Sequence, residues 1–143
     1  MDTNVLISAA LFPKHPLGKI IGRALEFQNF ALSEETFAEL EEVLMREKFD
    51  RYLGKQTRSA FLEKTSAKAR WVDTGQIDPV RDCRDDKDNK LLEVALAAKA
   101  NYVITGDQDL LVLDPWRGIR LLTPADFGVL MEDARTDQSS IEG

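Results

Sequence analysis

Five carboxylates stand where an α/β protein is expected to do chemistry. Asp2 lies in the N-terminal run DTNVLIS, and Glu39 lies in the helix predicted after the second strand. Asp88 opens the apolar helix DNKLLEVALAA, while Asp107 and Asp109 follow the apolar strand YVIT. Doubly wound sheets bind ligands beyond the carboxyl ends of their strands, where these side chains are expected to meet. They are therefore the candidate site.

Each carboxylate also has a plain structural explanation. The acidic run before Asn89 can cap a helix, because carboxylates favour the positive end of a helix dipole. The two aspartates after Gly106 suit a turn and a helix cap, and Glu39 can face solvent. These explanations hold for each residue alone, so the prediction of a site rests on their joint placement.

Convergence of these groups requires a cation. Two unscreened carboxylates about 4 Å apart repel by about 4 kcal/mol at an effective dielectric of about 20. The chain has one cysteine and one histidine, which leaves oxygen ligands and favours Mg2+ or Mn2+. Such an ion polarises a phosphoryl oxygen and activates a water, and a second ion about 3.5 to 4 Å away stabilises the leaving oxygen. The pattern therefore points to phosphodiester hydrolysis without a nucleophilic side chain.

Composition favours one folded domain. The chain has 143 residues, of which 43% are hydrophobic and 31% charged, and this is enough apolar mass for a single core. We predict a domain over residues 1–134 and a polar tail over 135–143. No apolar run approaches the ~20 residues that span a bilayer, and no signal-type stretch is present, so no membrane association and a cytoplasmic location are expected.

Charge is unevenly distributed along the chain. The formal net charge is -6, which argues against a general nucleic-acid coat protein. Residues 46–70 nevertheless hold eight basic and three acidic side chains, a local balance of +5. This stretch is either a basic arm that grips a polyanion or a solvated helical face, and the sequence leaves both interpretations open.

Apolar periodicity predicts alternating helices and strands. Spacings of three and four favour helices, Ser33 is a suitable N-cap, and Pro124 suits the first turn of the last helix. Helices are predicted at residues 16–28, 34–45, 57–69, 88–98 and 124–133, and strands at 30–32, 71–72, 102–105 and 120–122. Short apolar strands between helices indicate a three-layer α/β/α domain around a central parallel sheet.

Four runs carry a family resemblance. DTNVLISA, SEETFAELEEVL, CRDDKDNKLLEVALAAKANYVITGDQDLL and RGIRLLTPADF together resemble the PIN-domain family, in its prokaryotic branch of VapC-like toxins from toxin-antitoxin pairs. The resemblance extends to about Leu130 and implies a metal-dependent endoribonuclease. Asp88 is preferred over Asp85 and Asp86 because its DN pair leads into the apolar helix.

The resemblance also implies roles for single residues. Asn4 would orient Asp2, and Thr105 would support the site from the end of its strand. The implied site comprises catalytic Asp2, Glu39, Asp88 and Asp107, metal-binding Asp2, Asp88, Asp107 and Asp109, and supporting Asn4 and Thr105.

One departure concerns the first strand. In this family the first aspartate closes a central strand, whereas only Met1 precedes Asp2 here. A truncated first strand leaves unpaired backbone groups and a slot in the core, which costs several kcal/mol. The hypothesis is that the native chain starts further upstream or has been shortened, and that residues 5–10 begin a helical turn. The alternative is a displaced N-terminus that misplaces Asp2.

Three functions compete at this point. The leading one is a Mg2+- or Mn2+-dependent endoribonuclease that cuts single-stranded RNA as the toxin of a toxin-antitoxin pair. The second is a catalytically inactive PIN-fold module that binds RNA or protein. The third is a haloacid-dehalogenase-type phosphatase, whose chemistry needs an acid two residues after its nucleophilic aspartate, where this chain has Asn4.

The ribonuclease interpretation predicts further contacts. The RNA backbone would run from the basic stretch into the acidic pocket, with Lys55 and Arg58 as RNA-binding residues. The resemblance implies an antitoxin protein that covers the pocket, and it implies a possible homodimer.

Overall fold

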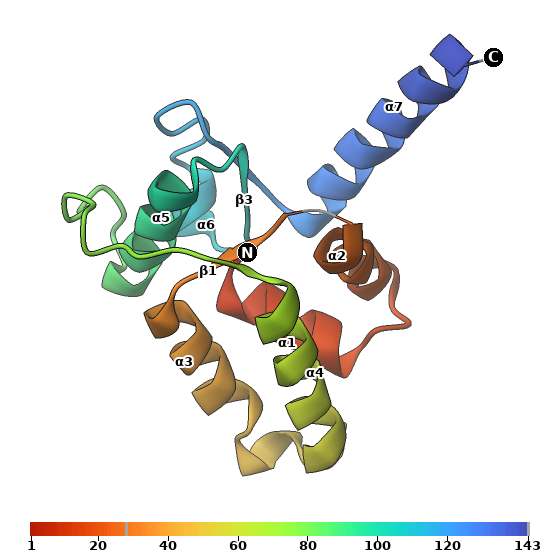
Figure 1. The fold of residues 1–143 in the computed structure, drawn as a ribbon, viewed down its shortest axis with the longest axis vertical. Coiled ribbons are helices and arrows are strands. Elements are labelled where there is room, and N and C mark those ends of the chain that lie inside the picture. Colours follow the sequence, from red (N-terminus) through yellow and green to blue (C-terminus); the bar gives the residue numbers. More distant parts are fainter. Residues whose placement is uncertain (28, 143) are drawn as a thin grey trace.

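The computed structural model describes residues 1–27 and 29–142, with side chains described as far as residue 133. Helices and short strands alternate along the chain (Figure 1). In chain order the elements are α1 (Thr3–Leu11), α2 (Pro16–Phe27), β1 (Ala31–Leu32), α3 (Glu34–Leu44), η1 (Glu47–Phe49), α4 (Lys55–Lys68), β2 (Arg70–Trp71), α5 (Asp86–Ala98), β3 (Tyr102–Ile104), α6 (Gln108–Leu111), β4 (Arg120–Leu122) and α7 (Pro124–Glu142).

The strands form two parallel pairs. β1 pairs with β2, and β3 pairs with β4, so the predicted α/β class with parallel strands is confirmed. The predicted central sheet is divided into these two separate pairs. The Asp2 N–H donates to the Ile104 carbonyl (2.9 Å). A cleft of about 300 Å³ is lined by Met1 and by residues of both β1 and β3.

Helix α1 begins directly after Asp2, its N-cap, so the helical turn predicted at residues 5–10 is confirmed. Leu6 and Ile7 pack in a cluster with α3 and α4. Val5 and Ala9 pack on the opposite side, in a cluster with α2 and β3. A helix that is apolar almost all round is stable only when it is buried, so α1 forms the centre of the packing rather than a surface layer.

Helices α3 and α4 form a hairpin with η1 at its far end, below the strands in Figure 1. Ser33 caps α3 as predicted, because its hydroxyl accepts from the Thr36 N–H (3.1 Å). Fully buried Leu40 and Leu44 then pack with Leu62 of α4. This packing fixes the distance between the start of α3, beside the strands, and η1.

Helix α7 begins as predicted and extends further than predicted. The Thr123 hydroxyl accepts from the Asp126 N–H (3.1 Å), and Pro124 is the first helical residue. The helix was expected to end near Asp133 but continues to Glu142. Of the predicted tail, the side chains of residues 135–142 and all of residue 143 lie outside the described part. Among the described helices, none is long and apolar enough to cross a membrane.

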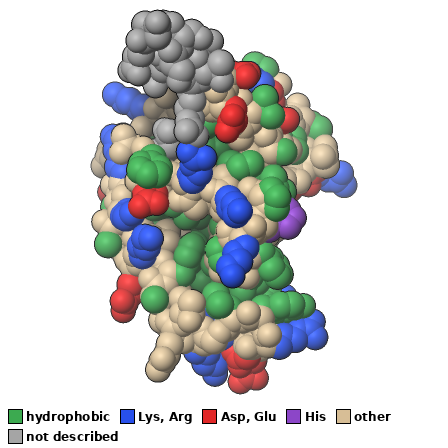
Figure 2. Space-filling view, turned by 90° about the vertical axis from the view of Figure 1, so that its right-hand side faces the viewer, with side chains coloured by type: hydrophobic (Ala, Val, Ile, Leu, Met, Phe, Trp, Pro, Cys, Tyr) green, Lys and Arg blue, Asp and Glu red, His purple; other side chains and the backbone are tan. Residues whose placement is uncertain are grey.

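A second face of the molecule is hollowed and apolar. Figure 2 shows hydrophobic side chains around a hollow, with the single histidine, His15, at one edge. The hollow has a volume of about 420 Å³ and lies between α1 and α2, lined by Val5, Phe12 and Leu17 among others. Its described lining contains no carboxylate, so the acidic residues belong to a different part of the surface.

Candidate metal centre

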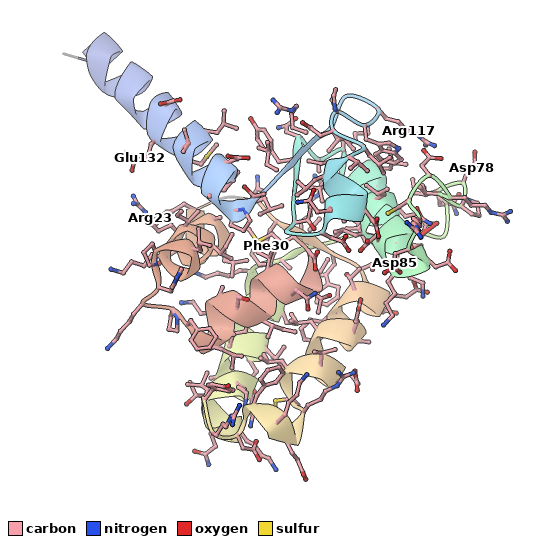
Figure 3. The ribbon with its side chains drawn as sticks, turned by 180° about the vertical axis from the view of Figure 1, so that it is seen from behind. Arg23, Phe30, Asp78, Asp85, Arg117 and Glu132 are labelled. Carbon is pink, nitrogen blue, oxygen red and sulfur yellow. The ribbon has the colours of Figure 1, made fainter. Side chains whose placement is uncertain are left out.

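Three aspartates meet at the carboxyl edge of the strands. Carboxylate oxygens of Asp85, Asp88 and Asp107 all lie within 4.8 Å of one another. Asp85 and Asp88 come from the start of α5, while Asp107 follows β3 (Figure 3 labels Asp85). Asp88 and Asp107 were predicted to converge. Asp85 was weighed as an alternative to Asp88 and set aside, although the acidic run before the apolar helix carried the signal for it.

Helix capping and site formation involve the same side chains. Asp2, Asp85 and Asp107 are the N-caps of α1, α5 and α6. Each carboxylate accepts a backbone N–H two residues ahead, at 2.9, 3.0 and 2.9 Å in the same order. The partial positive charge at a helix N-terminus stabilises a nearby carboxylate. The two explanations offered by the sequence are therefore compatible, since the caps are what aim these side chains.

Thr105 connects Asp2 to Asp107. Its buried hydroxyl donates to Asp2 Oδ2 (2.7 Å) and accepts from the Asp107 N–H (3.0 Å). Asp2 is buried, and its other oxygen, Oδ1, accepts from the Asn4 N–H. Asn4 therefore contacts Asp2 through its backbone, while Thr105 contacts it through its side chain.

The electrostatics of Asp88 reflect a crowded acidic site. Burial raises its pKa to about 7, and a hydrogen bond with Asp107 and the negative charges of Asp107, Asp85 and Asp2 act in the same direction. A carboxyl group that resists ionisation beside other carboxylates gains from a neighbouring cation. Oxygen ligands at this spacing suit a hard divalent ion, so these residues fit the predicted Mg2+ or Mn2+.

The two remaining predicted acids are placed differently. Glu39 is half-buried on α3 and lines the same cleft as Asp2, Asp88 and Asp107, outside the group of three. Asp109 is half-buried and belongs neither to that group nor to the described lining of the cleft. Its role as a metal ligand stays a prediction.

A short loop fixes the start of α5. The buried Asn89 side chain accepts from the Cys83 N–H (2.8 Å) and donates to the Cys83 carbonyl (3.1 Å). This two-way contact ties the loop to the first turn of the helix, where Asp85 and Asp88 lie. The carboxylates are therefore held by packed backbone rather than by a free loop.

The structure corrects one predicted RNA contact. Arg58 is fully buried, and its guanidinium donates to the Leu44 and Arg46 carbonyls (2.9 and 3.1 Å) and to Asp50. It therefore holds the α3–α4 hairpin together and does not face a polyanion. Lys55 is exposed, 4.0 Å from Asp50, and its RNA contact stays a prediction.

An α/β fold with aspartates gathered at the carboxyl edge of its parallel strands defines a nuclease-type domain. The chain belongs to the PIN-domain family, because a family model described as PIN domain matches residues 1–109. Proteins of this family are generally metal-dependent nucleases, which agrees with the acidic group found here.

Comparison with curated proteins gives a similar relative. An uncharacterized protein of Methanocaldococcus jannaschii is 33% identical to this chain over 119 residues, which cover 79% of this chain and 72% of the relative. No solved structure matches the chain significantly.

Proposed function

We propose that this protein is a Mg2+- or Mn2+-dependent endoribonuclease that hydrolyses phosphodiester bonds of single-stranded RNA. The observation that carries the proposal is the group of Asp85, Asp88 and Asp107, whose carboxylate oxygens lie within 4.8 Å. This arrangement supports metal binding at the strand edge of a nuclease-type fold. The cleft beside the group also contains Asp2 and Glu39.

Each residue has a distinct part in this mechanism. Asp85, Asp88 and Asp107 would hold the metal, which supplies a polarised phosphoryl oxygen and an activated water when bound. Thr105 keeps Asp2 and Asp107 in a fixed relation through its two hydrogen bonds. Glu39 faces the same cleft from α3, where a carboxylate can orient or deprotonate a water.

The test is cleavage of a fluorescent single-stranded RNA in EDTA, Mg2+ or Mn2+. Asp107→Asn is the informative variant, because asparagine also caps helices and so α6 is kept. We expect metal-dependent cleavage by the wild type and a loss of at least about a hundredfold in the variant. Asp86→Asn is the matched control, since this exposed neighbour lies outside the group and should leave the rate within about twofold.

Other results would contradict the proposal. Undiminished cleavage in EDTA, or equal losses in both variants, would remove the assignment of the site. Absence of cleavage by a folded wild type in either metal would favour the inactive binding module. Turnover of a chromogenic phosphomonoester in place of RNA would favour a phosphatase.

The biological setting we propose is the toxin of a toxin-antitoxin pair. An antitoxin would cover the acidic cleft, presenting a basic side chain to its carboxylates. Exposed Phe12 and Leu17, at 48% and 40% exposure, offer apolar area to a protein partner or a second copy. Growth arrest on expression of the wild type but not of Asp107→Asn would support the toxin role, and equal arrest by both would contradict it.

A further inference from the structure

The acidic group lies at one end of a longer groove. A cleft of about 370 Å³ runs between α1 and α3, which lie side by side in the structure (Figure 3). Asp88 and Asp107 line it near the strands, and Arg46, Lys48 and Phe49 line it near η1. The lining of α3 extends from Thr36 to Val43, about 10 Å of helix, comparable to about three stacked nucleotides. The groove therefore joins a negative end to a positive end.

Two cations near η1 have no acidic partner among the described residues. Arg46 pairs with Glu42 (2.9 Å), whereas Lys48 and Arg51 make no ion pair in that part of the chain. Lys48 is exposed, with its ammonium 5.1 Å from the centre of the Phe49 ring. A cation left free at the end of an acidic groove suits a phosphate group of a strand that reaches from the carboxylates.

Aromatic rings stand next to these cations. The Arg51 guanidinium lies 4.8 Å from the centre of the Tyr52 ring, and its Nη2 donates to the Tyr52 hydroxyl (2.8 Å). Tyr52 packs edge-on against Phe12 with ring centres 5.8 Å apart, and both rings are about half exposed. Exposed aromatic rings beside arginine are a surface on which unstacked bases bind. We name Phe12, Arg51 and Tyr52 the aromatic platform.

Helix α1 separates Asp2 from Phe12 of the platform by about 15 Å. Phe49 of the groove leads directly to the platform, since its carbonyl accepts from the Tyr52 N–H (3.0 Å). The carboxylates and the free cation line the groove, whereas the platform lies just beyond its η1 end, where Phe12 also lines the apolar hollow between α1 and α2. Their order matches a single strand of nucleic acid, in which successive nucleotides offer phosphates to the cations and unpaired bases to the rings.

We propose that the α1–α3 groove is the track for single-stranded RNA, with a phosphate on Lys48 and a base on the aromatic platform. The inference rests on the proposed ribonuclease function and adds where the substrate lies outside the metal centre. Stacking on the platform needs an unpaired base, so the track selects single-stranded RNA over a duplex. In this proposal Lys48, and not the buried Arg58, contacts a phosphate of the RNA.

Binding without cleavage tests the track. Anisotropy of a fluorescein-labelled single-stranded RNA is measured in EDTA, for the wild type, Lys48→Ala and Tyr52→Leu. We expect Lys48→Ala to weaken binding about three- to tenfold and to reduce the salt dependence by about one counterion. Tyr52→Leu should weaken binding about tenfold, the typical loss when one base stops stacking.

Matched controls come from other surfaces. Lys64→Ala removes an exposed cation of the same basic stretch on α4, and Phe27→Leu removes a ring that is 75% exposed at the end of α2. Both should bind RNA within about twofold of the wild type. All four variants change exposed side chains, so their melting temperatures should stay within a few degrees of the wild type, with the largest shift in Tyr52→Leu, which loses its contacts with Phe12 and Arg51.

The outcomes separate the track from the proposed function. Unchanged affinity in both Lys48→Ala and Tyr52→Leu, with RNA still cut by the wild type, would overturn the track and leave the ribonuclease. Selective losses in these variants, with no cleavage in Mg2+ or Mn2+, would support the track and overturn the ribonuclease. Equal affinity for duplex RNA, or no RNA binding by the folded wild type, would overturn the track.

Discussion

The two ends of the α1–α3 groove handle charge in opposite ways. At the strand end, Asp85, Asp88 and Asp107 lie within 4.8 Å, with no basic side chain paired to them among the described residues. At the η1 end, several basic side chains are already paired with acceptors of the protein itself. Arg58 binds Asp50 and two backbone carbonyls, and Arg46 pairs with Glu42.

This difference shows which charges are available for binding. The carboxylates at the strand end keep a surplus of negative charge that favours an added cation. Burial and this negative charge together raise the pKa of Asp88. The basic end contributes fewer free charges than its composition indicates, because an arginine used in packing cannot also contact RNA. Of the residues lining that end, Lys48 remains free of ion pairs.

The largest expected effect comes from Arg58→Met. The change keeps most of the side-chain volume but leaves the Leu44 carbonyl without its donor, while the Arg46 carbonyl keeps only the Phe49 N–H (3.1 Å). One unsatisfied buried acceptor and the lost pair with Asp50 should lower the free energy of unfolding by about 3 kcal/mol. Urea unfolding measures this.

The control for Arg58 is Lys64→Met, an exposed change on the same helix that should stay within about 0.5 kcal/mol. If Arg58→Met were as stable as the control and bound RNA more weakly, the contrast between the two ends would be wrong. Arg58 would then serve as the RNA contact that the sequence predicted.

Sequence reasoning succeeded where local pattern decides geometry. Asp107 follows an apolar strand and Asp88 opens an apolar helix, and such positions meet at one edge of a parallel α/β sheet. It failed for Arg58, because a charge count along the chain contains no information about burial. It also passed over Asp85, since a cap and a site residue have the same sequence signal.

The strand arrangement was also only partly predictable. The parallel pairing follows from short apolar strands between helices. Their division into two pairs is a property of the whole chain, as is the hydrogen bond between the Asp2 N–H and the Ile104 carbonyl, a contact between distant parts of the sequence. Aromatic contacts such as Phe12 with Tyr52 are of the same kind, because they join the end of α1 to the turn after η1.

Thr105→Val sharpens the contrast at the strand end. It removes the hydroxyl between Asp2 and Asp107 while keeping the side-chain shape. We expect the free energy of unfolding to fall by about 2 kcal/mol, as for a hydrogen bond to a charged group, and Mn2+ affinity to fall about tenfold or more. Urea unfolding and Mn2+ titration measure the two effects. Thr105→Ser should restore both, and failure of this rescue would show that the methyl group matters instead.

The pH dependence of the free energy of unfolding, measured on the metal-free protein, tests the surplus of negative charge at the strand end. Burial and Asp107 raise the pKa of Asp88 from 3.8 to about 7, so the folded state binds more protons than the unfolded state in this window. The free energy of unfolding should therefore decrease as the pH rises from 4 to 7, and the full penalty should persist above 7.

Asp88→Asn should flatten this pH dependence, because asparagine does not titrate. Urea unfolding in EDTA at pH 5 and pH 8 measures the difference between the two proteins. Mn2+ binding should follow the opposite trend in the wild type and strengthen from pH 6 to pH 8, since the metal requires the ionised carboxylate. If the free energy of unfolding changed between pH 5 and pH 8 by the same amount in the wild type and in Asp88→Asn, the assignment to Asp88 would be contradicted.

The smallest effect is expected for Lys55→Ala. Lys55 is exposed, and its ammonium lies 4.0 Å from Asp50, which is already bound by Arg58. An exposed pair of this kind contributes about 0.2 to 1 kcal/mol at most, so stability should change little. RNA affinity should fall less than in Lys48→Ala, because Asp50 offsets part of the charge that Lys55 offers to a phosphate. Anisotropy across a salt series compares the two variants. If Lys55→Ala had the larger loss, the RNA would follow α4 instead of the groove between α1 and α3.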